Sequence, residues 1–361
     1  MVFDPLKAYN ELPALPPPIE LETKPVLKAC IRANQALAEL KMAGELIPNQ
    51  AMLINTIPLQ EAQASSEIEN IVTTQDQLFR ADASGGKDAD PSTKEVLRYR
   101  TALKKGFEAL KKRPLSTNSF KDICGIIFER EVNVRKIPGT VIKNTQTGEV
   151  HYTPPEGEKV ILDKLADFEK YLHLEDDIDP LVRLALIHYQ FEAIHPFHDG
   201  NGRTGRILNI LYLIEKNLLH VPVLYLSRYI IRNKAEYYSL LRAVTQDGQW
   251  EPWILYVLRA VDETARWTTR KIHEIRDSFH KTCQDCKEKL PSTIYSKDLI
   301  EILYQQPYCR IETLITAKIA KRQTASKYLQ EIEKIGVLKS LKIGREKLYL
   351  NKNLMKTLYN N

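Results

Sequence analysis

The sequence predicts a mainly α-helical protein with one β-hairpin in its middle and a smaller C-terminal module of helices and a second hairpin. Apolar residues recur at helical spacing through most of residues 25–273. One segment in that region, 140–153, instead alternates like two short strands around a turn. At 361 residues the chain exceeds the usual size of one domain, so more than one packed unit is expected.

The predicted helices follow one another with few long loops. Residues up to Thr23 include Leu15-Pro16-Pro17-Pro18 and are expected to run extended over the surface. Helical spacing with start and stop signals then predicts helices over 25–42, 58–69, 94–112, 117–130, 161–173, 180–194, 203–217, 234–245 and 252–273. Residues 81–91 contain Ser84-Gly85-Gly86 and are predicted to form a loop.

The central hairpin is predicted from alternating apolar and polar residues and from the prolines that follow its second strand. Its first strand, turn and second strand are predicted at Thr140-Val141-Ile142-Lys143, 144–148 and 149–153. Pro154-Pro155 ends the second strand because proline cannot donate a hydrogen bond to a strand ladder.

The pattern changes after residue 275. Residues 276–292 are predicted to be a linker, and short helices over 297–305, 310–317 and 322–335 are followed by strands at 337–342 and 347–350. This order, over residues 293–361, resembles a winged helix-turn-helix module. Its recognition helix would begin with Arg322, Gln323, Thr324, Ser326 and Lys327.

The positive charge of the chain is concentrated in this C-terminal part. From Lys271 onward there are 18 Lys/Arg and 10 Asp/Glu, a net charge of +8 in a chain whose total is +6. The module therefore has the charge to bind DNA through phosphate contacts. A protein-interaction or dimerisation module with an ordinary basic surface is the alternative, and the composition does not decide between them.

Composition and cysteine usage predict a cytoplasmic protein. No apolar run approaches the roughly 20 residues that span a bilayer, so no membrane partner is expected, and residues 1–5 lack the layout of a secretory signal. The five cysteines are odd in number and scattered, as free thiols in a reducing compartment would be. Cys283 and Cys286 lack the second pair that a zinc site of this type needs.

The strongest functional signal is the segment His-Pro-Phe-His-Asp-Gly-Asn-Gly-Arg-Thr-Gly-Arg at 195–206. The helices on both sides of it are apolar almost all round, which places them in the middle of a domain. Gly200 and Gly202 allow a sharp turn and a close backbone approach, and the helix that follows directs unpaired N–H groups at the same place. The segment therefore predicts an anion-binding loop held by a rigid core.

The side chains of this loop suit phosphate chemistry. Arg203 and Arg206 are three residues apart on one helical face, and their guanidinium groups can bind phosphate oxygens. Asp199 supplies the single carboxylate that phosphate-bound magnesium commonly takes from a protein. His195 can accept a proton at neutral pH. Together these groups predict phosphoryl or nucleotidyl transfer.

This twelve-residue segment resembles the signature HPFx(D/E)GNGRxxR of the Fic family of protein AMP-transferases, and every fixed position matches. The resemblance implies a Fic-type helical core, over residues 94–275, with the hairpin as its flap. It also implies that ATP with Mg²⁺ donates AMP to a hydroxyl side chain (Ser, Thr or Tyr) of a target protein. His195 would be the general base and Asp199 the metal ligand, while the nucleotide would be bound by Gly200, Asn201, Gly202, Arg203 and Arg206.

The resemblance also assigns roles to two other segments. Thr140, Val141, Ile142 and Lys143 would form the flap strand that docks the target by strand addition. Ser65-Ser-Glu-Ile-Glu69-Asn70 is similar to the family's inhibitory motif (S/T)xxxE(G/N), within an N-terminal helical region at 1–93. In a helix over about 58–70, Ser65 and Glu69 share one face. Glu69 would then pair with Arg206 and keep ATP in an unproductive pose.

Other interpretations of the same residues stay open. His195, His198 and Asp199 could be zinc ligands, although this leaves the arginines and glycines without a role. His188 lies in an apolar helix and is expected to be a hydrogen-bonded core residue. The chain could also be a transcription regulator that senses a nucleotide and binds DNA, which would need the anion-binding loop but no base. Target identity and the balance between AMP addition and removal are not predicted. The N-terminal and C-terminal extensions offer surfaces for a homodimer, although the sequence does not determine the oligomeric state.

Overall fold

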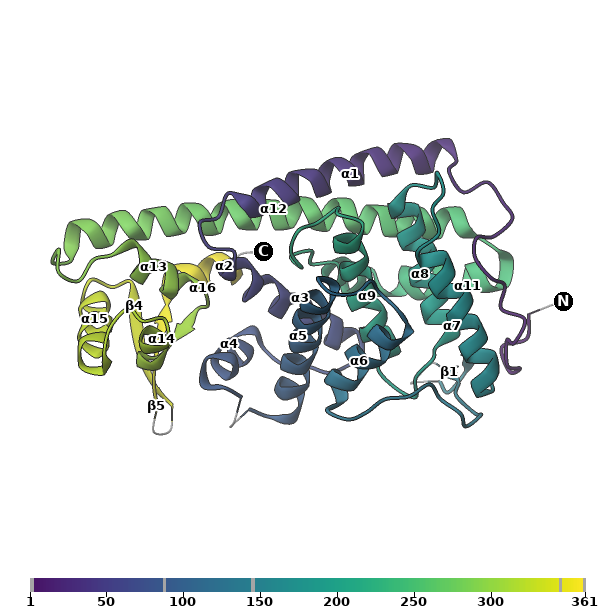
Figure 1. Ribbon diagram of the computed structural model, residues 1–361, viewed down its shortest axis with the longest axis horizontal. Coiled ribbons are helices and arrows are strands. Elements are labelled where there is room, and N and C mark those ends of the chain that lie inside the picture. The colour runs from purple at the N-terminus through teal and green to yellow at the C-terminus, as the bar shows by residue number, and fades with distance from the viewer. Residues whose placement is uncertain (1–2, 87–88, 144–146, 344–345, 360–361) are drawn as a thin grey trace.

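The computed structural model describes residues 3–86, 89–143, 147–343 and 346–359, and it confirms the mainly helical fold (Figure 1). The helices are α1 (Lys24–Glu45), α2 (Ala51–Ile54), α3 (Ile57–Ile68), α4 (Gln75–Ser84), α5 (Pro91–Leu110), α6 (Thr117–Phe128), α7 (Glu158–Leu172), α8 (Pro180–Ile194), α9 (Asn201–Glu215), α10 (Ser227–Arg232), α11 (Lys234–Asp247), α12 (Trp250–Lys289), α13 (Lys297–Tyr304), α14 (Ile311–Thr316), α15 (Arg322–Lys334) and α16 (Lys352–Tyr359). The strands are β1 (Ile142–Lys143), β2 (Val150–Tyr152), β3 (Tyr308–Cys309), β4 (Leu338–Ile343) and β5 (Glu346–Asn351).

Helices α8 and α9 form the centre of the larger part of the molecule. Nearly every side chain of both is buried, as expected for helices that are apolar on all sides. Asp179 caps α8 by accepting a hydrogen bond from the backbone N–H of Leu181 (2.7 Å), and Pro180 occupies its first turn. These signals explain why the predicted bounds of α8, 180–194, agree with the structure.

The long helix α12 joins the two parts of the chain. It runs for 40 residues, about 60 Å at 1.5 Å per residue, and α1 lies along it (Figure 1). The prediction of a linker over 276–292 is wrong up to Lys289, because α12 continues to that residue. Ile275, Phe279 and Thr282 are buried against the C-terminal elements, so this segment supports the module instead of separating it.

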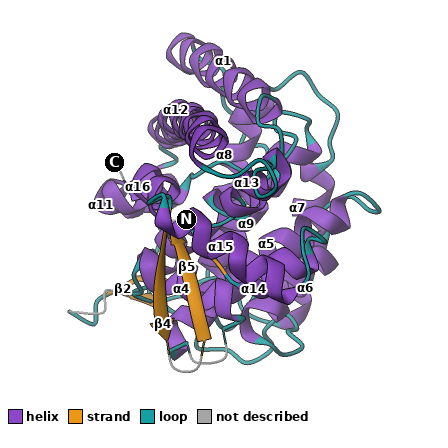
Figure 2. Cartoon of the chain, turned by 90° about the vertical axis from the view of Figure 1, so that its left-hand side faces the viewer, coloured by secondary structure: helices purple, strands orange, loops and turns teal. Residues whose placement is uncertain are grey.

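The C-terminal module has the order of elements that the sequence predicts, with two additions. Its three helices, α13 to α15, are followed by β4 and β5, which pair antiparallel in the register Leu338↔Asn351 to Ile343↔Glu346. The short strand β3 completes a three-stranded sheet in the order β3-β5-β4, and α16 ends the described chain. Figure 2 shows β4 and β5 side by side. The predicted turn includes residues 344–345, which lie outside the described residues.

The central hairpin and the loop before α5 differ in detail from their predictions. β1 and β2 pair antiparallel with an irregular register, Ile142↔Tyr152 and Lys143↔Val150, and are shorter than predicted. Residues 144–146 of the predicted turn lie outside the described residues. The predicted loop over 81–91 overlaps α4, which a complete capping box at Thr74 and Gln77 starts. Within the described residues, no helix has both the length and the apolar character needed to cross a membrane.

Candidate active site

The loop between α8 and α9 is held in a sharp bend by its backbone. His195 ends α8 with a φ of +50°, and Gly200 precedes α9 with a φ of +78°. The left-handed region is costly for a histidine and is typical of functional sites. At Gly200 a Cβ would lie 2.5 Å from Phe128 Cε2, so this position needs glycine for space as well as for conformation.

Asn201 fixes the inside of this loop. Its Oδ1 accepts from the backbone N–H of Phe197 and its Nδ2 donates to the carbonyl of Phe197, both at 2.8 Å. Phe197 is buried in the core. Asn201 thus shapes the loop around the anion-binding turn, a role that the sequence interpretation as a nucleotide contact does not include.

His195 is arranged to act as a neutral base. Its Nδ1 lies 3.3 Å from the backbone carbonyl of Glu192, which favours the tautomer with hydrogen on Nδ1 and a lone pair on Nε2. Burial, and then the charge of Arg135, lower the pKa of His195 to about 4. The imidazole is therefore uncharged at neutral pH and can accept a proton.

Arg135 is a site residue that the sequence interpretation missed. It is almost fully buried, and its guanidinium donates to the carbonyl of His195 (Nε, 2.8 Å), to that of Ile194 (Nη2, 3.4 Å) and to that of Pro155. Its backbone N–H also donates to the carbonyl of Pro196 (2.9 Å). These bonds join the end of the hairpin to the histidine, and they form between segments that only the fold brings together.

The hairpin is attached at its base to the end of α8. The hydroxyl of Tyr152 donates to the carbonyl of Ala193 (2.8 Å), two residues before His195. Val141 and Lys143 are exposed on the first strand, while Thr140 and Ile142 are partly buried. The predicted flap residues therefore belong to a hairpin that the Tyr152 hydrogen bond holds close to His195.

Arg203 is buried and already paired. Its Nη1 donates to Glu95 Oε1 at 2.5 Å, and its guanidinium lies over the ring of Phe128 at 5.1 Å. Its Nη2 is 3.9 Å from Oδ1 of Asp199, whose side chain is 69% exposed. The buried Nε–H of Arg203 has no partner among the described residues, so one donor remains for an anion.

Arg206 is held by the predicted inhibitory motif. Its Nε donates to Oγ of Ser65 (2.8 Å), and its Nη2 donates to the carbonyl of Ser65 (2.9 Å) and to Oε1 of Glu69 (2.8 Å). Arg206 is only 1% exposed. Burial raises the pKa of the Glu69 carboxyl, but the nearby Arg206 outweighs it and the pKa ends below its ordinary value. Glu69 is therefore a carboxylate in this pair.

The Glu69 carboxylate also lies in the turn that the sequence predicts to bind an anion. A Cβ on Gly202 would overlap Oε1 of Glu69, so the carboxylate lies against the first turn of α9. Asn70 follows with a φ of +63°, the left-handed conformation that ends helices and that asparagine adopts more easily than most residues. Lys234 Nζ donates to the last carbonyl of α3, at Ile68 (2.6 Å). The end of α3 is thus positioned to present Glu69.

Helix α3 is docked by further buried polar bonds. Glu61 accepts from the backbone N–H (2.8 Å) and the hydroxyl (2.5 Å) of Ser227, and from the hydroxyl of Tyr99 (3.2 Å). Gln60 donates to the carbonyl of Leu358, in the C-terminal module (3.1 Å). The module also contacts the next helix, because the hydroxyl of Tyr308 donates to Asp76 Oδ1 of α4 (2.6 Å).

Two more titratable groups lie beside this site. Burial raises the pKa of Glu192 to about 7, and its buried Oε1 has no partner among the described residues. His188 is a core residue, as expected: its Nε2 lies 2.9 Å from the hydroxyl of Tyr237, and burial lowers its pKa to about 3. Glu192 was not singled out in the sequence, where it is one residue of an apolar helix.

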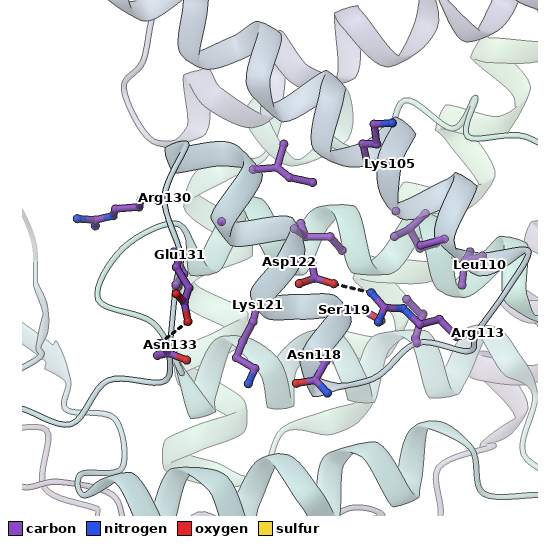
Figure 3. A pocket seen from close by; sticks show the side chains of 18 of the residues that line it. Lys105, Leu110, Arg113, Asn118, Ser119, Lys121, Asp122, Arg130, Glu131 and Asn133 are labelled. Atoms are coloured by element: carbon purple, nitrogen blue, oxygen red, sulfur yellow. Dashed lines mark hydrogen bonds and ion pairs between the residues drawn. The ribbon is translucent and has the colours of Figure 1, made fainter.

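The described residues offer no alternative metal centre. No group of three or more His, Cys, Asp or Glu side chains among them is arranged to hold a metal ion. A groove of about 820 Å³ lies between α5 and α6, where Arg113 and Asp122 pair with each other (Figure 3). It contains no residue of the 195–206 loop, so it is separate from the site described above.

Three family models match consecutive parts of the chain. They are described as Fic/DOC family N-terminal (residues 27–108), Fic/DOC family (114–213) and Protein adenylyltransferase SoFic-like, C-terminal domain (279–354). The second model includes the whole 195–206 loop, and the third includes the C-terminal module.

Curated relatives and solved structures agree with these matches. The chain is 34% identical to protein adenylyltransferase fic-1 of Caenorhabditis briggsae over 35% of its own length, and 37% identical to a probable protein adenylyltransferase of Aquifex aeolicus over 25%. These matches span about a quarter of each relative, 24% and 26%. A Fic family protein from Desulfovibrio desulfuricans G20 shares the fold over 93% of this chain and 98% of its own (TM-score 0.60, 19% identity). Fic-1 of Caenorhabditis elegans shares it over 70% and 76% (TM-score 0.51, 20% identity).

Proposed function

Because the chain belongs to the Fic/DOC family, we propose that it is a protein adenylyltransferase that transfers AMP from ATP to a hydroxyl side chain of a target protein. One observation carries the proposal. A neutral histidine, an anion-binding helix start and two buried arginines meet at a single bend between α8 and α9. This arrangement can place a triphosphate and a proton acceptor at the same phosphorus atom.

In the proposed reaction, Nε2 of His195 accepts the proton of a target hydroxyl. The hydroxyl oxygen then bonds to the α-phosphorus of ATP, and the bond from that phosphorus to the bridging oxygen of the β-phosphate breaks. The products are an AMP-modified target and pyrophosphate. The backbone N–H groups of Asn201 and Gly202 and the Nε–H of Arg203 would stabilise the negative charge of the phosphates.

The residues present fit a magnesium ion that arrives with the nucleotide. Asp199 is an exposed carboxylate next to the anion-binding turn, and its Oδ1 accepts from the backbone N–H of Gly200 (2.6 Å). One carboxylate cannot hold Mg²⁺ alone, but Mg²⁺ bound to phosphates commonly takes one or two from the protein. Asp199 would hold the ion, which neutralises phosphate charge when bound.

The hairpin would position the target. An extended target segment that pairs with the free edge of β1 places its hydroxyl through backbone bonds, with little demand on its side chains. Thr140, Val141, Ile142 and Lys143 would form this edge, and the bonds of Tyr152 and Arg135 hold it beside His195. The target segment would thereby be aligned with the base.

The inhibitory motif would keep the enzyme at low activity. Glu69 places a carboxylate where a phosphate would bind and engages Arg206, which the nucleotide needs. ATP could then bind only in a pose that lacks this arginine. Release of the α3 end from α9 would restore activity.

The decisive experiment measures the intact mass of the purified chain after incubation with ATP and magnesium. The Glu69→Gly variant should gain the mass of AMP, with pyrophosphate released, while wild type gains less and His195→Ala gains none. If Glu69→Gly also gains none and modifies no protein in an extract with labelled ATP, the proposal is wrong.

The alternative function, a nucleotide-sensing regulator that binds DNA, has one supporting observation. Arg322, Gln323, Thr324 and Lys327 are exposed at the start of α15, and Lys342 and Lys347 are exposed on the adjoining strands. Duplex binding that falls steeply with added salt would support DNA binding by this module. A sensor would keep its response in His195→Ala, whereas an enzyme would lose AMP transfer. The cytoplasmic location stays a prediction.

A further inference from the structure

Three arginines come together where α10 packs on α12. Arg228 and Arg232 are one turn apart on α10, and Arg270 follows Trp267 by one turn on α12. The guanidinium carbon of Arg228 lies 4.5 Å from the centre of the Trp267 ring, which brings these two helix faces together. Arg228, Arg232 and Arg270 form the arginine cluster.

The arginine cluster has no counter-ion of its own. Among the residues that the structure describes, none of its three guanidinium groups has an ion pair or a hydrogen bond. The nearby acids are bonded elsewhere: Glu61 accepts from Ser227, and Glu274 accepts from Lys271 at 2.7 Å. The cluster therefore carries three positive charges that no carboxylate balances.

Arg228 is the central member of the cluster. It is only 9% exposed, yet its guanidinium nitrogens are not fully enclosed, so an anion can reach them from solvent. Burial, and then the charges of Arg232 and Arg270, lower the pKa of Arg228 below its ordinary value. A nearly buried cation that two others repel is costly, and a bound anion would remove this cost.

The chemistry of the cluster indicates phosphate as its ligand. Guanidinium groups bind phosphate oxygens bidentately, and a guanidinium that lies over a ring keeps its in-plane N–H donors available. A single carboxylate would leave most of the three charges unbalanced, whereas linked phosphates carry several charges on closely spaced oxygens. Trp267 is 8% exposed and covered by Arg228, so it offers no face to a nucleobase. Recognition would therefore depend on phosphate oxygens alone.

The cluster lies at a junction of three parts of the fold. Ser227, next to Arg228, holds Glu61 of α3. Lys271, next to Arg270, donates to the carbonyl of Thr357 in α16 (3.1 Å). An anion that joins α10 to α12 should therefore stabilise the folded chain and raise its Tm.

We propose that the arginine cluster is a binding site for a compact polyphosphate anion, either free pyrophosphate or the phosphate tail of a nucleotide. Arg228 would bind the anion beside the Trp267 ring, and Arg232 and Arg270 would complete the site. This site shares no residue with the 195–206 loop. The inference is independent of the proposed reaction.

Fluorine NMR of protein labelled with 5-fluorotryptophan tests the site directly. The chain has three tryptophans, so three signals are expected, and Trp267→Phe identifies the signal of Trp267. Inorganic pyrophosphate, added without magnesium at constant ionic strength, should shift this signal in a saturable way. The same addition should raise the Tm.

Substitutions within the cluster should weaken this binding. Arg228→Gln and Arg270→Gln should each raise the dissociation constant roughly tenfold to a hundredfold, the effect of one hydrogen bond between charged groups. Arg259→Gln is the matched control: it removes the same charge from an exposed residue of α12 that pairs with Glu236, and it should bind like wild type. Arg270→Gln should not lower the Tm in the absence of anion, because it removes repulsion between like charges.

Several outcomes would overturn the inference. One is no shift of the Trp267 signal at about 10 mM pyrophosphate (roughly ten times a dissociation constant of 1 mM). Another is equal affinity in Arg228→Gln, Arg270→Gln and wild type. Gly200→Ala, which alters the nucleotide loop, should keep the titration; if the shift is lost in Gly200→Ala and kept in Arg228→Gln, the anion binds at that loop instead.

Two further ligands identify the source of the phosphate. ATP that shifts the Trp267 signal at lower concentration than pyrophosphate would identify a nucleotide as the ligand, and weaker binding of ATP would identify the free anion. Duplex DNA that binds more tightly per phosphate, and loses this binding in Arg228→Gln, would assign the cluster to nucleic acid. That result would overturn the proposal of a compact anion.

Discussion

Glu69 and Arg206 are 137 residues apart in the chain, yet Oε1 of the first accepts a hydrogen bond of 2.8 Å from Nη2 of the second. Arg206 is almost completely buried, and its remaining bonds go to Ser65, one turn before Glu69. Arg206 of α9 is therefore engaged by one short segment, the last turn of α3 and the residue that follows it.

Glu69→Gly should raise AMP transfer. Arg206 then becomes available for one charge-assisted bond to the nucleotide, worth roughly 1.5–3 kcal/mol. That range corresponds to roughly tenfold to hundredfold in kcat/KM. Transfer of the radioactive AMP group from labelled ATP to protein measures this change in kcat/KM. Glu67→Gly is the control, because Glu67 is exposed in the last turn of α3 and a glycine there weakens the helix at least as much as one at Glu69, which lies just past its end. Glu67 has no contact with Arg206 among the bonds of that arginine described above. Equal gains in the two variants would mean that helix loosening, and not release of Arg206, explains the effect.

The pH profile of transfer should reflect the lowered pKa of His195. A pKa of about 4 leaves the imidazole neutral down to about pH 5, so kcat/KM of Glu69→Gly should stay nearly constant between pH 8 and 5 and fall below that. Arg135→Met removes the positive charge beside the ring and should move the acid limb to higher pH. An unchanged limb in Arg135→Met would contradict the role of this charge. Arg135→Lys keeps the positive charge and should return the acid limb part of the way to lower pH.

Glu95→Gln should make the protein depend on nucleotide for stability. The change removes the closer of the two anionic partners of the buried Arg203 and leaves only Asp199 at 3.9 Å, at a cost of roughly 3 kcal/mol or less. ATP phosphates can supply the missing negative charge, so ATP should raise the Tm of this variant by more than it raises that of wild type. Glu129→Gln, which removes the exposed partner of Arg98 on the same helix α5, should respond like wild type. A smaller ATP response in Glu95→Gln would contradict this account.

Gly200→Ala should destabilise the fold and the site together. The left-handed backbone costs a non-glycine residue about 1–2 kcal/mol. The added Cβ also meets Phe128 at 2.5 Å. A lower Tm with weaker ATP binding is expected in thermal and calorimetric measurements. Gly248→Ala has a φ of +63° with no atom near its Cβ, so it isolates the backbone cost and should lower the Tm less.

The parts of the structure that were predicted well carry local signals. The bounds of α8 follow from Asp179 and Pro180, and the pairing of Glu69 with Arg206 follows from the resemblance of residues 65–70 to the family's short inhibitory motif. The extent of α12 was underestimated, although no glycine or proline occurs between Pro252 and Pro291.

The missed site residues have no such local signal. Arg135 and Glu95 act through partners that are 60 and 108 residues away, and single-sequence patterns contain no information on such contacts. Asn201 belongs to the recognised motif, but its bonds to Phe197 depend on the fold of the loop. The motif thus predicted which residues form the site, and the coordinates were needed to show what each of them contacts.

The bonds from Gln60 to Leu358 and from Tyr308 to Asp76 join the C-terminal module to α3, the helix that ends next to Glu69, and to α4. Whatever free energy holds the C-terminal module against α3 and α4 adds to the cost of moving Glu69 away from Arg206. Coupling of this kind is reciprocal. A ligand that favours an undocked module would therefore raise the affinity for productively bound nucleotide. A productively bound nucleotide would, by the same factor, raise the equilibrium constant for undocking of the module.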